Sequence, residues 1–388
     1  MDKQLTPDKP LTILQILPAL QGGGVERGTL EVARHLVQHG HHSLVISADG
    51  RMVAQLEAEG STHFTWPVGK KSLFTLRLVP RLRRFLLEHE VDILHVRSRM
   101  PAWLAYLAWR GMNPATRPRF VTTVHGLYSV NRYSKVMLKG ERIIAVSNTV
   151  RDYILRNYPD TDPSRIEVIY RGVDAAEFPY AYQPGPDWLT AWRAQYPQLA
   201  GKHVITLPGR LTRLKGHEAF IELIARLKQC GLPVHGLIVG GEDPKRLGYA
   251  RELRQVVAAQ GLTADITFTG HRADMREVFA VSDLVLSLSS KPESFGRTVL
   301  EALRLGVPVV GYNHGGVGEI LSAIYPAGLV DTNAATQSLA ASIENLLKQP
   351  VAVGNQEAFP LSIMLGRTLS LYTYLIQRSR FDTGQSDS

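Results

Sequence analysis

The most informative segment of the chain reads Lys291-Pro-Glu-Ser-Phe-Gly-Arg-Thr-Val-Leu-Glu-Ala-Leu-Arg-Leu-Gly-Val-Pro-Val-Val310. It places a carboxylate, Glu293, at a Phe-Gly turn and a second carboxylate, Glu301, on the helix that is expected to follow. Eight helical residues span roughly 12 Å, more than the roughly 5–9.5 Å between the paired carboxylates of a glycoside hydrolase. Backbone N–H groups at the helix start suit an anion between the two acids. The segment therefore predicts a site for a long ligand with a polyol at each end and phosphate between them, as in a sugar nucleotide.

Apolar strands alternate with amphipathic helices along the rest of the chain, which indicates an α/β fold with parallel sheets. Strands are expected in the first half at Thr12–Leu17, Ser43–Ser47, Ile93–Val96, Phe120–Val124, Arg142–Ser147 and Ile166–Tyr170. Helices are expected between them at 26–39, 73–89, 101–110 and 149–157. Strands are expected in the second half at Val204–Pro208, Val234–Val239, Ile266–Thr269, Leu284–Leu288 and Val307–Val310. Helices are expected there at 215–230, 246–260, 273–281 and 297–305.

The length of 388 residues suggests about two domains, and 44% hydrophobic residues suffice for two cores. A stretch rich in Pro, Gly and aromatic residues, 175–200, is interpreted as the linker region. The expected domains are 1–178 and 179–360, followed by a C-terminal helix and a frayed tail in 361–388. Ligands of such folds bind at the carboxyl ends of the strands.

A basic loop follows the first strand of the second half, in the sequence Leu207-Pro-Gly-Arg-Leu-Thr-Arg-Leu-Lys-Gly-His217. Arg210 offers a fork of N–H donors and Lys215 a point charge, and together they suit a diphosphate. Taken alone, the loop fits a solvated basic surface equally well.

A glycine-rich turn follows the first strand of the chain, in the sequence Leu17-Pro-Ala-Leu-Gln-Gly-Gly-Gly-Val-Glu-Arg27. Its glycines let the backbone approach a ligand closely, and the next helix directs its N-terminus to the same place. The spacing is not that of a dinucleotide-binding fingerprint. An ordinary tight turn between strand and helix remains the alternative.

These motifs, in this order, resemble those of the retaining GT-B glycosyltransferases of family four, in which two glutamates with seven residues between them follow the pattern Pro-Glu-Ser/Gly-Phe-Gly. The resemblance implies two Rossmann-like α/β domains that face one another across a cleft, with the acceptor bound by the first domain and the donor by the second. It also implies that the last helix crosses back to the first domain. Two stretches, Gly-Gly-Gly-Val-Glu-Arg-Gly-Thr-Leu and Val-His-Gly-Leu-Tyr-Ser-Val-Asn, most resemble the bacterial branch that builds the lipopolysaccharide core.

The resemblance assigns roles to residues of the second half. Glu293 would bind hydroxyls of the donor sugar, Glu301 would bind the ribose, and Arg210 and Lys215 would neutralise the leaving diphosphate. The turn and helix start after Glu293 would hold the donor through Phe295, Gly296, Thr298 and Val299. The loop that ends at Arg272 would hold the nucleobase through backbone groups.

Other roles fall in the first half. His125, at a strand end, would lie near the transferred sugar, although a lone histidine is more often structural. Gly23 and Gly24 would lie near the donor phosphates. The acceptor-side residues would be Glu26, Asn148 and Arg171, where Arg171 replaces the usual Asn of the family; whether it meets an anion or only anchors the hinge stays open.

The net charge is +9. Residues 1–178 contribute 24 Lys and Arg against 17 Asp and Glu, or +7, and the remainder of the chain contributes +2. The first half therefore favours an anionic partner, but no nucleic-acid-binding motif accompanies the charge. Within 72–90 a basic amphipathic helix is expected, and it is either half-buried with a solvated face or docks on anionic lipid. Its four arginines are Arg77, Arg81, Arg83 and Arg84.

No cofactor or metal is expected beside the co-substrate, for which a UDP-sugar is the first choice. The triplet Asp160-Thr-Asp162 lies between prolines and is interpreted as a turn, and no His/Cys cluster suggests zinc. The lone Cys230 excludes a disulfide framework.

The N-terminal residues are a poor signal peptide, and no apolar run reaches roughly 18 residues. A cytoplasmic location is expected, with attachment to the inner face of the cell membrane as an open possibility.

The function expected from the sequence is transfer of a sugar from a nucleoside-diphosphate sugar to a glycolipid or oligosaccharide in lipopolysaccharide-core or related cell-surface glycan synthesis. Two rivals remain. A GT-B-fold epimerase would also bind a sugar nucleotide but would need no acceptor. A non-catalytic anion-binding protein would explain the charge but not the donor motifs.

Overall fold

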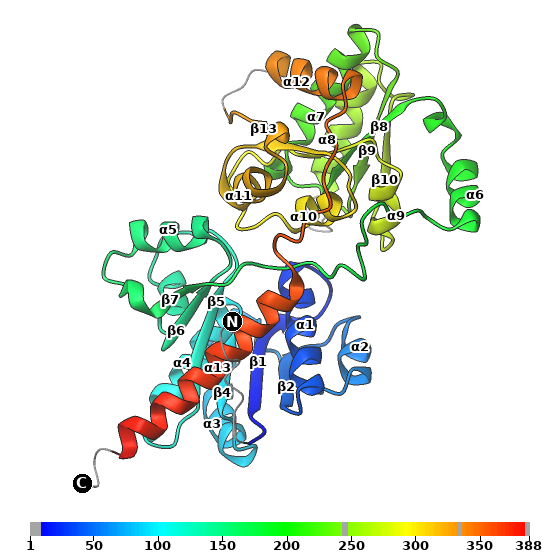
Figure 1. Ribbon diagram of the computed structural model, residues 1–388. Coiled ribbons are helices and arrows are strands. Elements are labelled where there is room, and N and C mark those ends of the chain that lie inside the picture. Colours follow the sequence, from blue (N-terminus) through cyan, green and yellow to red (C-terminus); the bar gives the residue numbers. More distant parts are fainter. Residues whose placement is uncertain (1–8, 243–246, 333–335, 385–388) are drawn as a thin grey trace. The chain divides into compact units, whose positions relative to one another are not determined.

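The computed structural model describes residues 9–242, 247–332 and 336–384, and the chain divides into two compact units. Unit 1 comprises the chain up to Gly172 together with the segment that begins at Leu361, and unit 2 comprises Val173–Pro360. Each unit has its own sheet with helices packed against it (Figure 1). The expected frayed tail at 385–388 lies outside the described residues.

Unit 1 is built on a parallel sheet with strand order β3-β2-β1-β4-β5-β6-β7. Its strands are β1 (Thr12–Ala19), β2 (His42–Ala48), β3 (Thr62–Thr65), β4 (Ile93–Val96), β5 (Arg119–Val124), β6 (Arg142–Ala145) and β7 (Ile166–Val168). Its α-helices are α1 (Gly24–Gln38), α2 (Val53–Ala58), α3 (Leu78–Glu88), α4 (Arg99–Arg110), α5 (Asn148–Asn157) and α13 (Leu361–Gly384). The strand order reverses beside β1, so the loops that follow β1 and β4 lie where ligands bind in doubly wound folds.

Unit 2 repeats this plan with the order β10-β9-β8-β11-β12-β13, again with parallel pairs. Its strands are β8 (His203–Pro208), β9 (Val234–Val239), β10 (Ile266–Gly270), β11 (Leu284–Ser287), β12 (Val309–Tyr312) and β13 (Leu329–Val330). Its α-helices are α6 (Pro186–Gln195), α7 (His217–Gln229), α8 (Leu247–Ala259), α9 (Met275–Ala280), α10 (Arg297–Arg304), α11 (Gly315–Ile324) and α12 (Thr336–Lys348). Here the order reverses between β8 and β11, so the loops that follow these two strands meet.

The last helix, α13, packs on unit 1, although the first strand of that unit lies at the other end of the sequence (Figure 1). Met364 and Leu371 are buried together with Ile13 and Ile93 from the sheet. Tyr372 is fully buried, and its hydroxyl shares a hydrogen bond of 2.6 Å with Nδ1 of His95. Apolar burial and one buried polar contact therefore fix this helix to the sheet.

Helix α10 begins and ends at glycines with positive φ. Gly296 (φ +104°) directly precedes the helix, and Gly306 (φ +85°) follows it. The N–H of Gly306 donates to the carbonyl of Leu303, and the N–H of Val307 donates to that of Ala302, each at 3.0 Å. These two bonds form a Schellman motif, which explains why the Gly-Val-Pro sequence stops the helix before β12.

The structure differs from the sequence-based expectations in several elements. The stretch 175–200 belongs to unit 2 rather than to a linker, because it forms α6 and buries Trp192 and Tyr196 against Leu237. The helix expected at 73–89 is split into a 3₁₀ turn, η1 (Leu73–Arg77), and α3. The edge strands β3 and β13 and the helices α2 and α12 were not expected.

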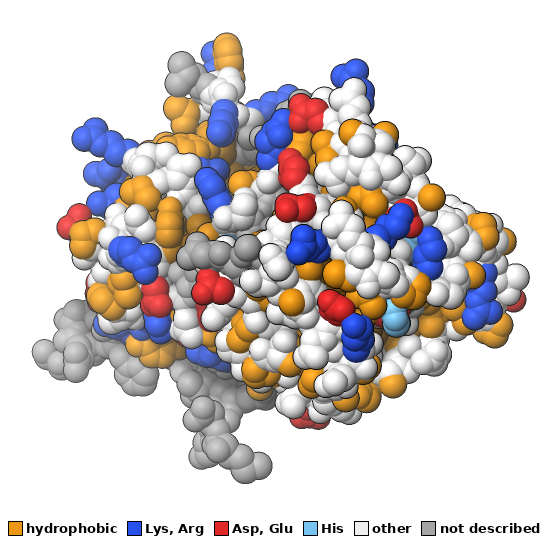
Figure 2. Space-filling view, turned by 90° about the horizontal axis from the view of Figure 1, so that it is seen from above, with side chains coloured by type: hydrophobic (Ala, Val, Ile, Leu, Met, Phe, Trp, Pro, Cys, Tyr) orange, Lys and Arg blue, Asp and Glu red, His pale blue; other side chains and the backbone are white. Residues whose placement is uncertain are grey.

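On the face shown in Figure 2, Lys and Arg side chains are interspersed with acidic, hydrophobic and uncharged groups. Over the described ranges, none of the helices combines the length and the apolar character that crossing a membrane requires.

Candidate functional site

The loops after β8 and β11 bring together the two charged residues that the sequence singled out most strongly. Lys215 ends the 3₁₀ turn η5 (Arg213–Lys215), and Glu293 lies in the loop between β11 and α10. Lys215 Nζ donates to Glu293 Oε1 at 2.7 Å. The side chains retain 31% and 24% of their exposure, so the pair is accessible from solvent. An accessible ion pair at the point where the strand order reverses is a natural binding point for a polar ligand.

The electrostatics of this pair keep Glu293 ionised. Burial by itself would raise the pKa of the Glu293 carboxyl, but Lys215, a hydrogen bond from Ser289 and the nearby His314 together hold that pKa below its ordinary value. Ser289 Oγ donates to the same oxygen, Oε1, as Lys215 does. Glu293 is therefore a hydrogen-bond acceptor at neutral pH.

Glycines let two neighbouring loops approach the loop that carries Glu293. A Cβ on Gly216 (φ +77°) would lie 2.0 Å from the carbonyl oxygen of Leu288, and a Cβ on Gly316 would lie 2.3 Å from Cα of Phe295. The N–H of Gly316 donates to the carbonyl of Glu293 at 2.8 Å. Helices α7, α10 and α11 all begin beside these loops, and the N–H groups of helix starts favour anions.

The cations of the β8–α7 loop have different partners. Arg210 is exposed, and the described residues offer its guanidinium no ion pair. Arg213, in contrast, pairs with Glu252 and Glu218 and lies 4.9 Å from the ring centre of Tyr249. Arg210 and Lys215 thus remain the cations placed to meet a diphosphate.

The start of α10 carries the residues that the sequence assigns to donor binding. The N–H of Val299 donates to the carbonyl of Gly296 at 3.1 Å, and a donor contact through Val299 stays a prediction. Phe295 is buried, and its ring meets that of Phe359 edge-on at 5.9 Å. Thr298 lies in the first helical turn, where backbone N–H groups lack intrahelical acceptors.

Glu301 lies on the buried side of the same helix, with 5% of its surface exposed. Arg297 Nε donates to Glu301 Oε1 at 2.8 Å, one helical turn away. The arginine thus covers the carboxylate that the sequence assigns to the ribose.

Arg272 is committed to a structural contact. Its guanidinium pairs with Asp274, with a bond of 2.8 Å from Nε to Oδ1, and lies 5.3 Å from the ring centre of Trp192. Trp188 Nε1 donates to the same aspartate at 2.8 Å. The side chain therefore helps to fasten α6 to the rest of unit 2, and binding of a base by the β10–α9 loop stays a prediction.

In unit 1, the glycine-rich turn leads directly into α1, which begins at Gly24. A Cβ on Gly23 would lie 2.7 Å from Oε2 of Glu26, whereas a Cβ on Gly24 would meet nothing within 4 Å. Gly23 and Gly24 are exposed and Glu26 is half-buried. The turn thus presents backbone and one carboxylate at the carboxyl end of β1, as the sequence predicts.

Two arginines at the strand ends of unit 1, Arg97 and Arg171, are buried. Arg97 is 2% exposed and donates from Nε to Gln15 Oε1 at 2.8 Å. Arg171 is 8% exposed; its Nη2 donates to the carbonyl of Gly24 at 3.2 Å and lies 3.6 Å from Glu31 Oε2. A Cβ on Gly28 would overlap the Arg171 guanidinium, so α1 packs over this arginine only because glycine stands there. Arg171 thus holds α1 within unit 1, and contact with an anionic acceptor stays a prediction.

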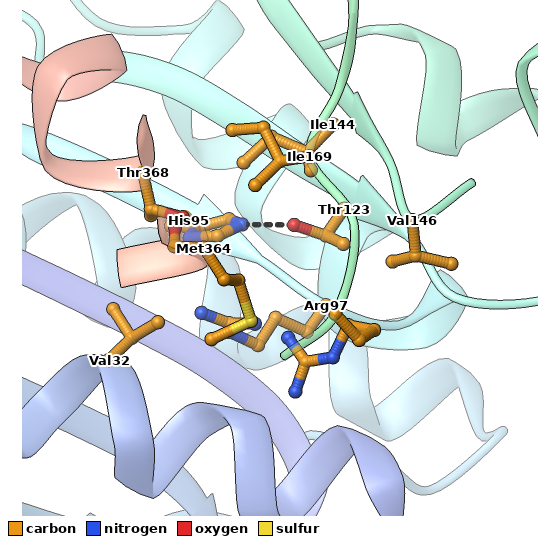
Figure 3. A pocket seen from close by; sticks show the side chains of 10 residues that line it. Val32, His95, Arg97, Thr123, Ile144, Val146, Ile169, Met364 and Thr368 are labelled. Carbon is orange, nitrogen blue, oxygen red and sulfur yellow. Dashed lines mark hydrogen bonds between the residues drawn. The ribbon is translucent and has the colours of Figure 1, made fainter. Parts of the chain in front are cut away.

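A small cavity of about 10 Å³ lies between α1, α13 and the sheet, and Arg97 and Arg171 line it. Figure 3 shows Val32 from α1 and Met364 and Thr368 from α13 around it. His95 shares a hydrogen bond of 2.6 Å with Thr123 here. Burial, followed by Arg97, His125 and Arg171, lowers the pKa of His95 well below its ordinary value, so this histidine is neutral. The cavity has room for about one water molecule.

His125 and Asn148 follow β5 and β6. Burial, then Arg171 and Arg97, lowers the pKa of His125 well below its ordinary value, so its ring is neutral and acts as a hydrogen-bonding group rather than as a cation. Asn148 begins α5, and its Nδ2 donates to the hydroxyl of Tyr170 at 2.6 Å.

The four arginines around α3 divide into two groups. Arg83 is half-buried and donates to the carbonyls of Leu107 and Ala108 at 3.1 Å, so it binds the C-terminal end of α4 and is not available to a membrane. The other three, Arg77, Arg81 and Arg84, are exposed.

The described residues contain no group of three His, Cys, Asp or Glu side chains that could hold a metal ion. Of the Asp160-Thr-Asp162 triplet, Asp162 accepts from the N–H of Ser164 at 2.9 Å and Asp160 pairs with Lys135 at 3.3 Å. These are the contacts of a surface turn.

Comparison with known proteins identifies the class. Residues 22–177 match the family described as Glycosyltransferase Family 4, and residues 190–359 match Glycosyl transferases group 1. A crystal structure of a glycosyltransferase from Rickettsia africae has 32% sequence identity and a TM-score of 0.82, over 95% of this chain and 99% of that chain. The chain therefore belongs to the family-4 glycosyltransferases, enzymes of the GT-B fold.

Two further comparisons describe relatives whose activity or ligands are known. The D-inositol 3-phosphate glycosyltransferase of Rhodococcus jostii is 32% identical over 222 residues, which are 56% of this chain and 47% of the relative. The chain thus spans about half the length of the curated relatives it matches. The Anabaena protein Alr3699/HepE, solved in complex with UDP and glucose, shares the fold at 22% identity, with a TM-score of 0.72 over 97% of this chain and 100% of that chain.

Proposed function

We propose that this glycosyltransferase moves a sugar from a nucleoside-diphosphate sugar, with a UDP-sugar as first choice, to a hydroxyl of a glycolipid or oligosaccharide, with retention of configuration and without a metal. The observation that carries the proposal is the contact between Lys215 and Glu293 at the carboxyl ends of β8 and β11. A cation for phosphate and a carboxylate for hydroxyls lie side by side there, as a sugar diphosphate requires. HepE, solved with UDP, supports the choice of base.

In the proposed reaction the bond between the anomeric carbon and the diphosphate oxygen breaks, and the electron pair leaves with the diphosphate. The acceptor hydroxyl forms the new bond on the same face, and its proton passes to the departing phosphate. Arg210 and Lys215 stabilise the charge that grows on the leaving group, which is the step where fixed charges contribute most. Glu293 orients the sugar and Glu301 binds the ribose.

A nucleotide-release assay tests the donor half of this proposal. Purified protein is offered UDP-, GDP- and ADP-sugars with and without acceptor, in buffer that contains EDTA. Acceptor-dependent release of one nucleoside diphosphate supports the proposal. Conversion of the donor without acceptor would favour the epimerase, and activity that requires added magnesium would overturn the metal-independent mechanism. NMR of the product's anomeric centre decides between retention and inversion.

The acceptor is proposed to be anionic. The glycine-rich turn and the His125 stretch resemble the branch that builds the lipopolysaccharide core, whereas the Rhodococcus relative is named for an inositol phosphate. Both acceptor types combine hydroxyls with negative charge, which fits the net charge of +7 in residues 1–178. Product formation with lipopolysaccharide core acceptors and with inositol 3-phosphate, measured side by side, distinguishes them.

We also propose that the enzyme meets its acceptor at an anionic membrane through η1 and α3. Phe74 is 69% exposed and Leu76 is 40% exposed, and the Arg77 guanidinium lies 4.7 Å from the centre of the Phe74 ring. Arg81 and Arg84, on α3, are exposed as well. Apolar groups flanked by cations suit an interface with anionic lipid.

A flotation assay with vesicles containing phosphatidylglycerol tests this proposal. The fraction of protein bound to the vesicles should fall when Arg77, Arg81 and Arg84 become Gln, and should not change in Arg193→Gln on α6. Equal binding to purely zwitterionic vesicles would contradict the proposal.

A further inference from the structure

The two oxygens of the Glu293 carboxylate have different surroundings. Lys215 Nζ and Ser289 Oγ both donate to Oε1. Within 9–242, 247–332 and 336–384, no side chain donates to Oε2, and the side chain as a whole is 24% exposed. The carboxylate is thus held by one oxygen and can offer the other to a ligand hydroxyl.

Ser289 is itself held firmly. It is 5% exposed, and its carbonyl accepts a hydrogen bond of 3.0 Å from Nε2 of His314, the residue before α11. The N–H of the next residue, Ser290, donates to the carbonyl of Leu214 at 2.9 Å. The loops after β12 and β8 therefore both fix the backbone from which the Ser289 hydroxyl reaches Glu293.

In the proposed reaction, the ammonium group of Lys215 has two partners, the Glu293 carboxylate and the leaving diphosphate. In the structure it pairs with Glu293, whereas during transfer it is required by the leaving diphosphate, which carries more charge than a carboxylate. As Lys215 turns to the phosphate, its hold on Oε1 weakens. The Ser289 hydroxyl is uncharged and buried, and it remains on Oε1 throughout.

We propose that Ser289 is a positioning residue, which holds the Glu293 carboxylate toward the hydroxyls of the donor sugar while Lys215 serves the diphosphate. This inference rests on the proposed function. Ser289 was not among the site residues expected from the sequence motifs. Its effect on catalysis would be exerted only through the position and charge of Glu293.

The test compares Ser289→Ala with Ser290→Ala, a neighbouring exposed serine whose backbone bond to Leu214 is unaffected. Because hydrogen bonds to charged groups are the stronger ones, kcat/KM should fall about tenfold or more in Ser289→Ala and change little in Ser290→Ala. Melting temperatures of both variants are measured to confirm folding. In a Glu293→Gln background, Ser289→Ala should cause almost no further loss.

A pH profile gives a second readout that a purely structural role would not move. The Ser289 hydrogen bond favours the ionised carboxylate, so its removal should raise the pKa of Glu293 and shift the acid limb of kcat/KM to higher pH. An equal loss in the wild-type and Glu293→Gln backgrounds, or an unshifted acid limb, would overturn the inference.

Failure of the proposed function gives a different result. If the wild-type enzyme releases no nucleotide from any donor and acceptor, the proposed function fails. The contact itself is then tested by ¹³C NMR titration of the Glu293 carboxyl in wild type and in Ser289→Ala. Identical titrations would overturn the role of Ser289 in holding Glu293, and a raised pKa in the variant would support it.

Discussion

The two units share one topology but use the charged residues at their strand ends differently. In unit 2, Lys215 and Glu293 meet with 31% and 24% of their side-chain surface exposed. In unit 1, Arg97 and Arg171 occupy comparable strand ends, yet they are 2% and 8% exposed. Lys215 of unit 2 is thus placed for a ligand, whereas Arg97 and Arg171 of unit 1 hold the scaffold together.

The last helix explains part of this difference. Helix α13 packs on the sheet of unit 1, and Tyr372 and Met364 come to lie beside His95 and the buried arginines. Buried charges must be paired or hydrogen-bonded, as Arg171 is with Glu31. A net charge counted from sequence therefore overstates the positive surface that unit 1 offers to an anionic acceptor.

The largest effect is expected from breaking the buried pair in unit 1. Arg171→Leu should lower the free energy of unfolding by about 3–5 kcal/mol, because it removes the buried guanidinium beside Glu31 and leaves the more exposed Arg27, at 3.8 Å, to pair with this buried carboxylate. Urea unfolding measures this. The control is Arg151→Leu on α5, where the arginine side chain is 41% exposed and the variant should change stability little. Full stability of Arg171→Leu combined with lost acceptor use would mean that this arginine serves the ligand instead.

The next effect concerns catalysis in unit 2. Lys215→Ala should lower kcat by about 10²–10³-fold, comparable to the loss of one fixed donor at a developing charge, and should raise the donor KM less. It should also raise the pKa of Glu293, so that the acid limb of the pH profile moves to higher pH. Arg213→Ala removes a cation from the same loop that is already paired with Glu252, and serves as the control. An effect on KM alone would show that Lys215 contributes only to ground-state binding.

A smaller loss is expected at the ribose. Glu301→Ala should weaken use of the donor by about 1.5–3 kcal/mol in kcat/KM, the usual range for a hydrogen bond to a charged group. Steady-state kinetics with varied donor measure the loss. Unchanged donor kinetics would contradict the assignment and leave Glu301 as the partner of Arg297.

The smallest effect is expected where α13 meets the sheet. Tyr372→Phe keeps the ring but removes the hydroxyl that meets His95, and should cost about 1–3 kcal/mol of stability because a buried ring nitrogen loses its partner. Tyr374→Phe, on the same helix and 40% exposed, is the matched control. Equal melting temperatures of the two variants would show that apolar packing alone holds the helix.

The sequence predicted the alternation of strands and helices and the strand ends that carry Lys215 and Glu293, because long apolar runs and glycine turns are local signals. It did not predict β3, whose Thr-His-Phe-Thr sequence lacks an apolar run, or α6, whose Trp192 is buried only by the fold. It also could not predict partners. Arg83 is one of four arginines expected on a basic helix, and only a tertiary contact shows that the end of α4 binds it.

Isothermal titration calorimetry of wild type and Glu293→Gln tests the central claim most directly, first with UDP and UDP-glucose and then with whichever pair the release assay selects. If Lys215 is shared between Glu293 and the diphosphate, Glu293→Gln should free the ammonium, so that the nucleoside diphosphate binds as well as before or more tightly. In the wild type, the sugar of the sugar nucleotide should add affinity beyond that of the nucleoside diphosphate. This added affinity should be smaller in Glu293→Gln, because the sugar hydroxyls no longer meet the Glu293 carboxylate. Equal weakening of both ligands, or unchanged binding of both, would contradict a donor site built on Lys215 and Glu293.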